Sequence, residues 1–413
     1  MQLVRLLLAL ASLAGVCGAS AQQPTSEPIT LQRAIELTLL HNAGLSAARR
    51  EVEAAEAALG QAGVLPNPNL EFGLDNIGNS RKAQAGDRTA SLQIGQLIEL
   101  GGKRHVRVRL AQTGRDLADW ELRARRAEVV ARAKLSFHDV LASQERNGLA
   151  EDSLNIARRF VETVEKRVLA GKVSPVEETR AKLTLSQAFV EREQARRELS
   201  AARQRLAALW GESPPGFPRV DGNLDRLPAL PDLQVLAERL HENPEYARWN
   251  SEIARRRAGI DAERAKAVPD VTLSGGVTRF SAFGDHAYMV GISIPLPVFD
   301  QNTGGILEAR RRLDKAQDDQ RAARQRLLAE LADVYHRTAA IRVEVEALRV
   351  EILPGAQSAF DAAARGYQLG KFGFIDVLDA QRTLSSARMQ HLRALADHQR
   401  GVTEIERLIG VAQ

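Results

Sequence analysis

Two carboxylates stand three residues apart, at Asp376 and Asp379, the spacing that makes them neighbours on one face of a helix. Like charges held close together repel one another and attract cations, which suits an electrostatic gate or a cation-selective entrance. An ordinary solvated helix face carries the same pattern. On these residues alone, the solvated face is the simpler interpretation.

The other reactive residue types form no recognisable active site. The histidines are scattered, and the nearest pair, His391 and His398, has no acidic or thiol partner at ligand spacing. The run Gly101-Gly102-Lys103-Arg104 resembles a phosphate loop, but Leu97 stands where that loop has its first glycine and no Ser or Thr follows the lysine. No nucleophile and base are arranged for catalysis. We therefore expect no enzyme activity, no cofactor and no metal site.

The N-terminal residues predict export. Arg5 precedes an apolar run over residues 6–16, and Ala19-Ser20-Ala21 has the small residues of a cleavage site. We therefore assign residues 1–21 to a secretory signal peptide cleaved between Ala21 and Gln22, with a retained anchor as the alternative. The only cysteine, Cys17, follows a valine where a lipoprotein signal has Gly, Ala or Ser, and whether it carries lipid stays open.

Composition excludes a helical membrane protein. Charged residues make up 26% of the chain, and after the signal no apolar stretch approaches the roughly 18 residues of a spanning helix. The net charge of +5 and the pI near 9.5 also occur in nucleic-acid binders, but here the two signs alternate, as in Glu191-Arg192-Glu193. Alternating signs are typical of a solvated helix face. No nucleic-acid partner is expected.

The chain is a tandem duplication, and this sets its architecture. Segments 168–211 and 367–410 align without a gap at an offset of 199 residues, and the identities include Gly171/Gly370, Lys172/Lys371, Thr184/Thr383, Leu185/Leu384 and Ser186/Ser385. Asn42 and Pro68 recur 201 residues later as Asn243 and Pro269. At the first offset, Asp376 and Asp379 match Glu177 and Arg180, so the acidic pair occurs in one repeat only.

Each repeat is predicted to contain a helix, two strands, a long helix and a third helix. The first repeat, 22–211, has them at 30–65, 68–77, 89–98, 103–170 and 175–209; after a Pro-rich linker at 212–231, the second repeat, 232–413, has them at 232–268, 269–280, 287–297, 306–369 and 374–409. The long helix of the first repeat would extend about 100 Å, which ordinary globular domains do not build. Pro354-Gly355 interrupts its counterpart.

The strand segments alternate apolar residues with polar or small ones, as in the run from Leu70 to Asp75. A soluble hairpin alternates in the same way, but the export signal and the long helices favour an outer-membrane barrel wall. A sheet edge finds no partner in lipid, so a spanning sheet has to close, and bacterial barrels need at least eight strands. The chain is therefore expected to assemble with copies of itself, in a number the residues leave open. The loops at 78–88 and 281–286 are expected to face outside.

Three motifs resemble the TolC-type outer-membrane efflux proteins: Leu65-Pro66-Asn67-Pro68-Asn69-Leu70-Glu71, the run from Gly95 to Arg104, and the run from Phe374 to Gln381. The form Ile98-Glu99-Leu100-Gly101-Gly102-Lys103-Arg104 resembles most closely the heavy-metal branch, the CzcC-type subunits. The resemblance covers essentially the whole mature chain. It implies a homotrimer with a 12-stranded barrel in outer-membrane lipid and a long helical tunnel in the periplasm. Its expected partners are a periplasmic adaptor protein and an inner-membrane, proton-driven RND-type transporter.

The resemblance also implies roles for two turns and for the acidic pair. The turns would form periplasmic tips that meet the adaptor, at Gly171-Lys172-Val173-Ser174-Pro175 and Gly370-Lys371-Phe372-Gly373-Phe374, although glycine would mark an ordinary turn as well. Three-fold symmetry would gather Asp376 and Asp379 into a gate at the tunnel mouth. The function implied is an exit duct, with heavy-metal cations as cargo. The alternatives are multidrug efflux, type I secretion and a periplasmic coiled-coil structural protein; an enzyme or nucleic-acid binder is supported only by the pI.

Overall fold

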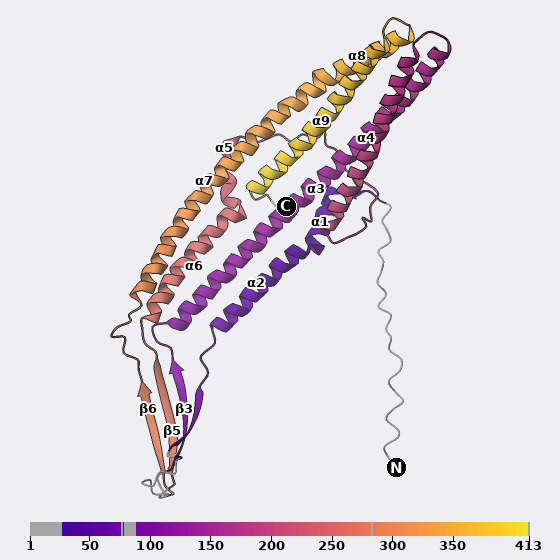
Figure 1. Cartoon of the computed structure of the whole chain (residues 1–413). Coiled ribbons are helices and arrows are strands. Elements are labelled where there is room, and N and C mark those ends of the chain that lie inside the picture. The colour runs from indigo at the N-terminus through magenta and orange to yellow at the C-terminus, as the bar shows by residue number, and fades with distance from the viewer. Residues whose placement is uncertain (1–26, 76, 78–87, 282–283, 412–413) are drawn as a thin grey trace, which may run out of the picture.

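The computed structural model describes residues 27–75, 77, 88–281 and 284–411. The protein is elongated: a sheet forms one end, long helices run away from it, and two helical hairpins form the opposite end (Figure 1). The prediction of a mostly helical, duplicated chain with four antiparallel membrane-type strands is confirmed. The predicted signal peptide and its cleavage site at Ala21 and Gln22 lie outside the described residues, as do most of loop 78–88 and part of loop 281–286.

The first repeat begins with a two-residue strand, β1 (Ile29–Thr30), and continues through helices and one strand pair. Its further elements are α1 (Leu31–His41), α2 (Ala43–Ala62), β2 (Asn69–Asp75), β3 (Thr89–Ile98), α3 (Lys103–Leu169) and α4 (Pro175–Ala208). The 67 residues of α3 extend about 100 Å at 1.5 Å a residue. This helix reaches from the sheet to the far tip (Figure 1).

The second repeat has the same order after a connecting segment that contains β4 (Val220–Asp221). Its elements are α5 (Leu233–Glu238), a 3-10 turn (Arg239–Glu242), α6 (Pro244–Lys266), β5 (Val271–Phe280), β6 (His286–Ser293), α7 (Thr303–Ala347), a π-helical turn (Leu348–Ile352), α8 (Leu353–Gln368) and α9 (Phe374–Leu408). The segment predicted as a linker is tied to the body, because β4 pairs with β1 and Phe217, Val220 and Leu224 are buried in the largest hydrophobic cluster.

Two predicted helices are broken where an asparagine stands. Asn42 has extended backbone between α1 and α2, and its side chain accepts a hydrogen bond from the Leu45 amide. Its amide group also donates to the Leu209 carbonyl at 2.8 Å, near the end of the third helix of the repeat. Asn243 does the same before α6 and donates to the Leu408 carbonyl at 2.8 Å. Each asparagine thus caps one helix and satisfies a carbonyl at the end of another.

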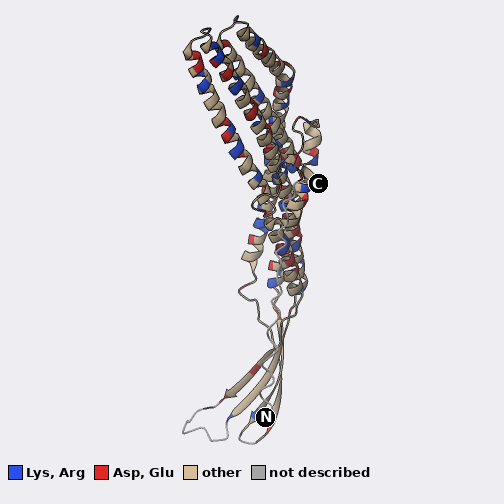
Figure 2. Cartoon of the chain, turned by 90° about the vertical axis from the view of Figure 1, so that its right-hand side faces the viewer, with Lys and Arg blue, Asp and Glu red and all other residues tan. Residues whose placement is uncertain are grey.

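Alanines pack the long helices closely together. On α4 the buried residues Ala181, Ala188, Ala195 and Ala202 recur every seven positions, and α3 is the helix that packs along α4. A seven-residue repeat is the pattern of coiled-coil packing, and the small side chains let the helix axes approach. Lys, Arg, Asp and Glu are spread along the outer helix faces, whereas few of them lie on the strands (Figure 2).

Candidate functional site

The four-stranded sheet has two chemically different faces. Its strands run antiparallel in the order β2-β3-β5-β6, and their register places apolar residues opposite one another in rows. One row across the sheet is Phe72, Leu92, Val277 and Tyr288, and the next is Leu70, Ile94, Gly275 and Val290. Most of these large apolar side chains are exposed. The sequence alternation in each strand thus combines into a single apolar face.

On the opposite face of the sheet, two neighbouring rows carry polar or small residues except at Met289. These rows are Glu71, Gln93, Gly276 and Met289, and Gly73, Ser91, Thr278 and Ala287. β2 and β6 are the outer strands, and each has a neighbour on one side only in the described chain. A sheet with one apolar and one polar face fits a wall between lipid and water, provided that its edges find partners.

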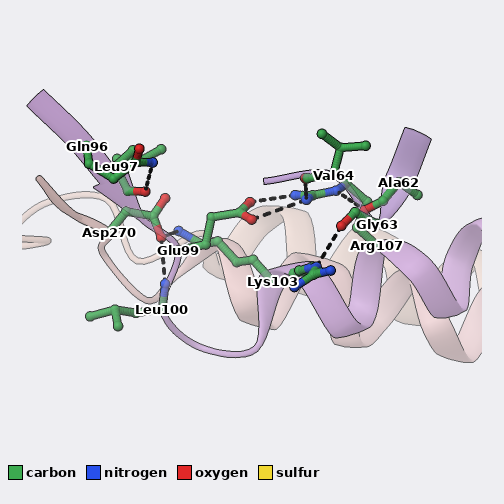
Figure 3. A network of polar contacts seen from close by, with 11 residues as sticks. Ala62, Gly63, Val64, Gln96, Leu97, Glu99, Leu100, Lys103, Arg107 and Asp270 are labelled. Carbon is green, nitrogen blue, oxygen red and sulfur yellow. Dashed lines mark hydrogen bonds and ion pairs between the residues drawn. The ribbon is translucent and has the colours of Figure 1, made fainter. Parts of the chain in front are cut away.

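A polar network fixes the junction between the sheet and the helices (Figure 3). The Arg107 guanidinium donates to both carboxylate oxygens of Glu99, at 2.5 and 3.2 Å, and also to the carbonyls of Ala62 and Val64 at the end of α2. Hydrogen bonding to Glu99 raises the pKa of Arg107. Beside it, Arg104 donates to the Gly63 carbonyl at 2.7 Å. These arginines satisfy carbonyls that the end of a helix leaves free.

The second half of the junction joins the two repeats. The Lys103 ammonium lies 2.7 Å from an Asp270 carboxylate oxygen, and the Leu100 amide donates to the same carboxylate at 3.0 Å. Gly101 and Gly102 both have positive φ, +64° and +69°, and turn the chain from β3 into α3. The motif that superficially resembles a phosphate loop therefore forms a structural corner between strand and helix.

Both predicted tips are helical hairpin turns with the same backbone design. Gly171 and Gly370 have φ of +68° and +73°, and the amide of each donates to the carbonyl three residues earlier. The next amides, of Lys172 and Lys371, donate to the carbonyls of Arg167 and Gly366. This is the Schellman ending of a helix, which favours glycine because a side chain there is strained.

The return helices begin differently at the two tips. After the half-buried Val173, Ser174 accepts a hydrogen bond from the Val176 amide and Pro175 occupies the first turn of α4. At the second tip, Gly373 precedes α9, Phe372 is exposed and Phe374 is buried. The two turns therefore share the backbone geometry of their glycines but expose different side chains.

Asp376 and Asp379 are exposed near the start of α9. The Asp376 carboxylate accepts a hydrogen bond from the Gly373 amide at 2.8 Å, a capping contact that stabilises the helix N-terminus. Asp376 thus has a local structural role as well as its exposed charge. Its counterpart Glu177 accepts a hydrogen bond from the Tyr367 hydroxyl at 3.3 Å.

A contact that the sequence did not predict joins the two hairpins near their tips. The Arg167 guanidinium donates to the Tyr367 carbonyl and lies 4.3 Å from the centre of the Tyr367 ring. Tyr367 is buried with Phe374 and Val377 in a small cluster that includes α3 and α4 residues. Tyr367 aligns with Val168 in the first repeat, so the duplication gave no signal for it.

One histidine is buried in the helical core. His398 on α9 is fully buried, and neither ring nitrogen has a hydrogen-bond partner. Burial lowers the pKa of its imidazole, and the Arg342 charge lowers it further. In the described ranges, no group of three or more His, Cys, Asp or Glu residues is placed to hold a metal ion. None of the helices described is long and apolar enough to cross a membrane.

One protein family matches both repeats. The outer membrane efflux protein model matches residues 34–212 and 235–411. The chain therefore belongs to the outer membrane efflux protein family, and it is an outer-membrane efflux channel, of a class that is not enzymatic.

Two of the relatives are named as heavy-metal resistance proteins. The chain is 39% identical to the cobalt-zinc-cadmium resistance protein CzcC of Cupriavidus metallidurans, over 93% of this chain and 90% of that protein. It is 28% identical to the nickel and cobalt resistance protein CnrC of the same organism, over 68% of each. The solved structure of CusC is similar with a TM-score of 0.78 at 20% identity, covering 92% of this chain and 91% of that one, a likeness that establishes the fold.

Proposed function

We propose that this protein is the outer-membrane exit duct of a tripartite pump that exports heavy-metal cations. The observation that carries the proposal is the sheet, which is apolar on one face, polar on the other and open at both outer strands. Three copies, each with four strands, would close a twelve-stranded barrel with lipid outside and water inside. The helices, about 100 Å long, would continue the barrel as a periplasmic tunnel.

Metal cargo is supported by the similarity to two proteins whose names state metal resistance. In a passive duct, cations would pass without a fixed binding site, while an inner-membrane RND-type transporter selects them. Deleting the gene should raise cellular cobalt, zinc or cadmium, and the gene supplied in trans should restore export. Sensitivity to organic toxins with unchanged metal content would favour multidrug efflux, and a secretion defect would favour type I secretion. A heat-resistant oligomer in the outer-membrane fraction separates all of these from a soluble periplasmic coiled-coil protein.

We place the adaptor contact at the two tips, residues 171–175 and 370–374. This assignment is supported by the position of both turns at the end of the molecule far from the sheet (Figure 1). Replacing Gly171 and Gly370 with valine adds side chains where φ is positive, which strains each turn by about 1–2 kcal/mol. Export should fail while the oligomer still forms. Normal metal resistance in that variant would contradict the assignment.

We propose Asp376 and Asp379 as the gate at the tunnel mouth. Their exposure near the second tip supports this, because repetition around a symmetry axis would concentrate the negative charge. Changing both to asparagine should weaken block of the reconstituted channel by multivalent cations. Since Asp376 also caps α9, the single variant Asp379→Asn is the cleaner test, and block equal to that of the unchanged protein in both variants would refute the gate.

A further inference from the structure

The apolar face of the sheet carries basic side chains at one end. Alternate residues of the four strands form this face, and within the strands as described it has no Asp or Glu. Its basic residues in the strands are Arg279 on β5 and His286 on β6, which are paired directly with each other. Arg279 is also paired with Ala90 on β3. The basic groups of the apolar face therefore lie together in one row.

Arg88 adds a second guanidinium group next to this row. It precedes Ala90 by two residues, so it continues the same face of β3, and its carbonyl accepts a hydrogen bond from the Ser281 amide at 2.9 Å. Arg88 is thus the diagonal neighbour of Arg279, at a distance of about 7–8 Å in an antiparallel pair. Both arginines are exposed, and among the described residues no carboxylate forms an ion pair with either. Two long cationic side chains can therefore converge on one ligand.

The row lies where the apolar band of the sheet ends. The hairpins are at the end of the sheet far from the helices (Figure 1), so in the proposed duct, with its helices in the periplasm, they face outside. Arg279 is eight residues from Val271, the first residue of β5. This is about 27 Å along the strand, or about 20 Å along the membrane normal at a tilt of about 40°. Barrels have an apolar band of roughly 25 Å, so the row falls near its outer edge.

Tyr288 lies at the same boundary. It is on the apolar face one row nearer the helices than Arg279, opposite Val277, and is 87% exposed. Val290 follows in the next row and is 93% exposed. A tyrosine, with its apolar ring and polar hydroxyl, is typical of the interface between membrane and water. Along β6 the face thus changes from apolar at Val290 through amphipathic at Tyr288 to basic at His286, as expected where a strand leaves hydrocarbon for head groups.

The polar face of the sheet carries the opposite charge. Glu71 and Asp75 lie on this face, and Asp75 is paired with Thr89 in the row next to that of Arg279. At the hairpin end, carboxylates therefore lie on the water side and guanidinium groups on the lipid side. Charges that served only to keep the rim hydrated would not need this separation. The separation indicates an anionic partner on the lipid side.

We propose that Arg88, Arg279 and His286 bind the phosphate groups of a lipid in the outer leaflet. In a bacterial outer membrane that lipid is lipopolysaccharide, a phosphorylated glycolipid. A guanidinium group holds phosphate oxygens through paired, charge-assisted hydrogen bonds, and the acyl chains of the same molecule would cover Tyr288 and Val290. The site rests on the orientation of the proposed duct and is independent of its cargo.

Native mass spectrometry of the purified oligomer with lipid A, the phosphorylated anchor of lipopolysaccharide, tests this site. Arg88→Gln with Arg279→Gln removes both guanidinium groups and should weaken lipid A binding by about tenfold or more, because charge-assisted hydrogen bonds are lost. The matched control, Arg255→Gln with Arg257→Gln, removes the same charge from exposed positions on α6 and should leave the affinity for lipid A unchanged.

The lipid provides a second measurement, which needs no variant. The unchanged oligomer should bind lipid A about tenfold or more tightly than lipid A from which the phosphates have been removed. Equal affinity for these two lipids, or an affinity for lipid A that is the same with and without Arg88 and Arg279, would overturn the site. Cellular metal content, measured in the same strains, reports separately on the exit duct, so the two proposals fail independently.

Discussion

The corner between β3 and α3 makes a quantitative prediction at two adjacent glycines. Gly101 and Gly102 have almost the same positive φ, but their surroundings differ. A Cβ atom on Gly101 would lie 2.8 Å from the Val268 Cβ and 2.9 Å from its Cγ2, whereas a Cβ on Gly102 would meet nothing within 4 Å. Alanine at the two positions therefore separates backbone strain from steric overlap.

The magnitudes follow from these surroundings. Left-handed backbone costs an alanine about 1–2 kcal/mol at either position. Forcing a methyl group into the packed side of Val268 adds about 1–3 kcal/mol at Gly101 alone. We therefore expect Gly101→Ala to lower the stability of the corner by about 1–3 kcal/mol more than Gly102→Ala does. The effect should be concentrated where the sheet joins the helices.

Hydrogen exchange of the amides in residues 97–107, measured on the purified oligomer, gives the local opening free energy of the corner. Val268→Gly removes the opposing carbon atoms and should relieve Gly101→Ala but leave Gly102→Ala unchanged, a coupling that a double-mutant cycle measures. Equal destabilisation by the two alanines, or no coupling to position 268, would refute the steric reasoning.

Three further predictions concern the helices. Burial lowers the pKa of His398, so its contribution to stability is complete above about pH 6.5 and is lost as pH falls from there toward the lowered value. His398→Leu should therefore flatten the fall in melting temperature between about pH 7 and 5, and an unchanged fall would contradict this reasoning. Arg107→Ala removes the partner of Glu99, whose side chain is 11% exposed, and should lower the free energy of unfolding by about 1–2 kcal/mol after allowance for solvent at the arginine. Arg107→Lys should recover only part of the lost thermal stability, and full recovery would contradict a role for the guanidinium fork. Gly148→Ala, in open space on α3, should raise stability by about 0.8–1 kcal/mol, and a loss of stability would mean that another copy covers that face.

The recurrence of Asn42 as Asn243 was visible in the sequence, but its reason was not. The two asparagines break helices that were predicted to be continuous, because each side chain caps the following helix and also reaches a carbonyl 165 or more residues away. The hydrophobic periodicity of a segment depends on residues that are close along the chain, so it contains no information about these distant carbonyls. The outcome differs at Pro354, where the predicted interruption is a π-helical turn followed directly by α8, with the proline in its first turn. The Leu353 amide donates to the Leu348 carbonyl five residues earlier, so the proline lies inside a nearly continuous helix that is widened locally by the π-helical turn.

Strand alternation predicted the character of the sheet faces, since side chains alternate between faces at every residue. Resemblance to a known family marks the motif at 98–104, yet its contact between Lys103 and Asp270 depends on how β3 meets β5 and cannot be deduced from either segment alone. The contact between Arg167 and Tyr367 is hidden from the sequence for the same reason. Contacts between repeats depend on tertiary register, which local patterns do not contain.

The pairing of β3 with β5 has a consequence for assembly. Ten residue pairs join the first repeat to the second along these strands, within one chain. Were the repeats separate polypeptides, that joint would form only when two of them met, and a ring would need twice as many molecules to collide. Fusing them makes half of the joints unimolecular, so ring closure depends less steeply on protein concentration. For a chain that has to reach the outer membrane and find its copies there, duplication thus lowers the concentration at which the channel assembles.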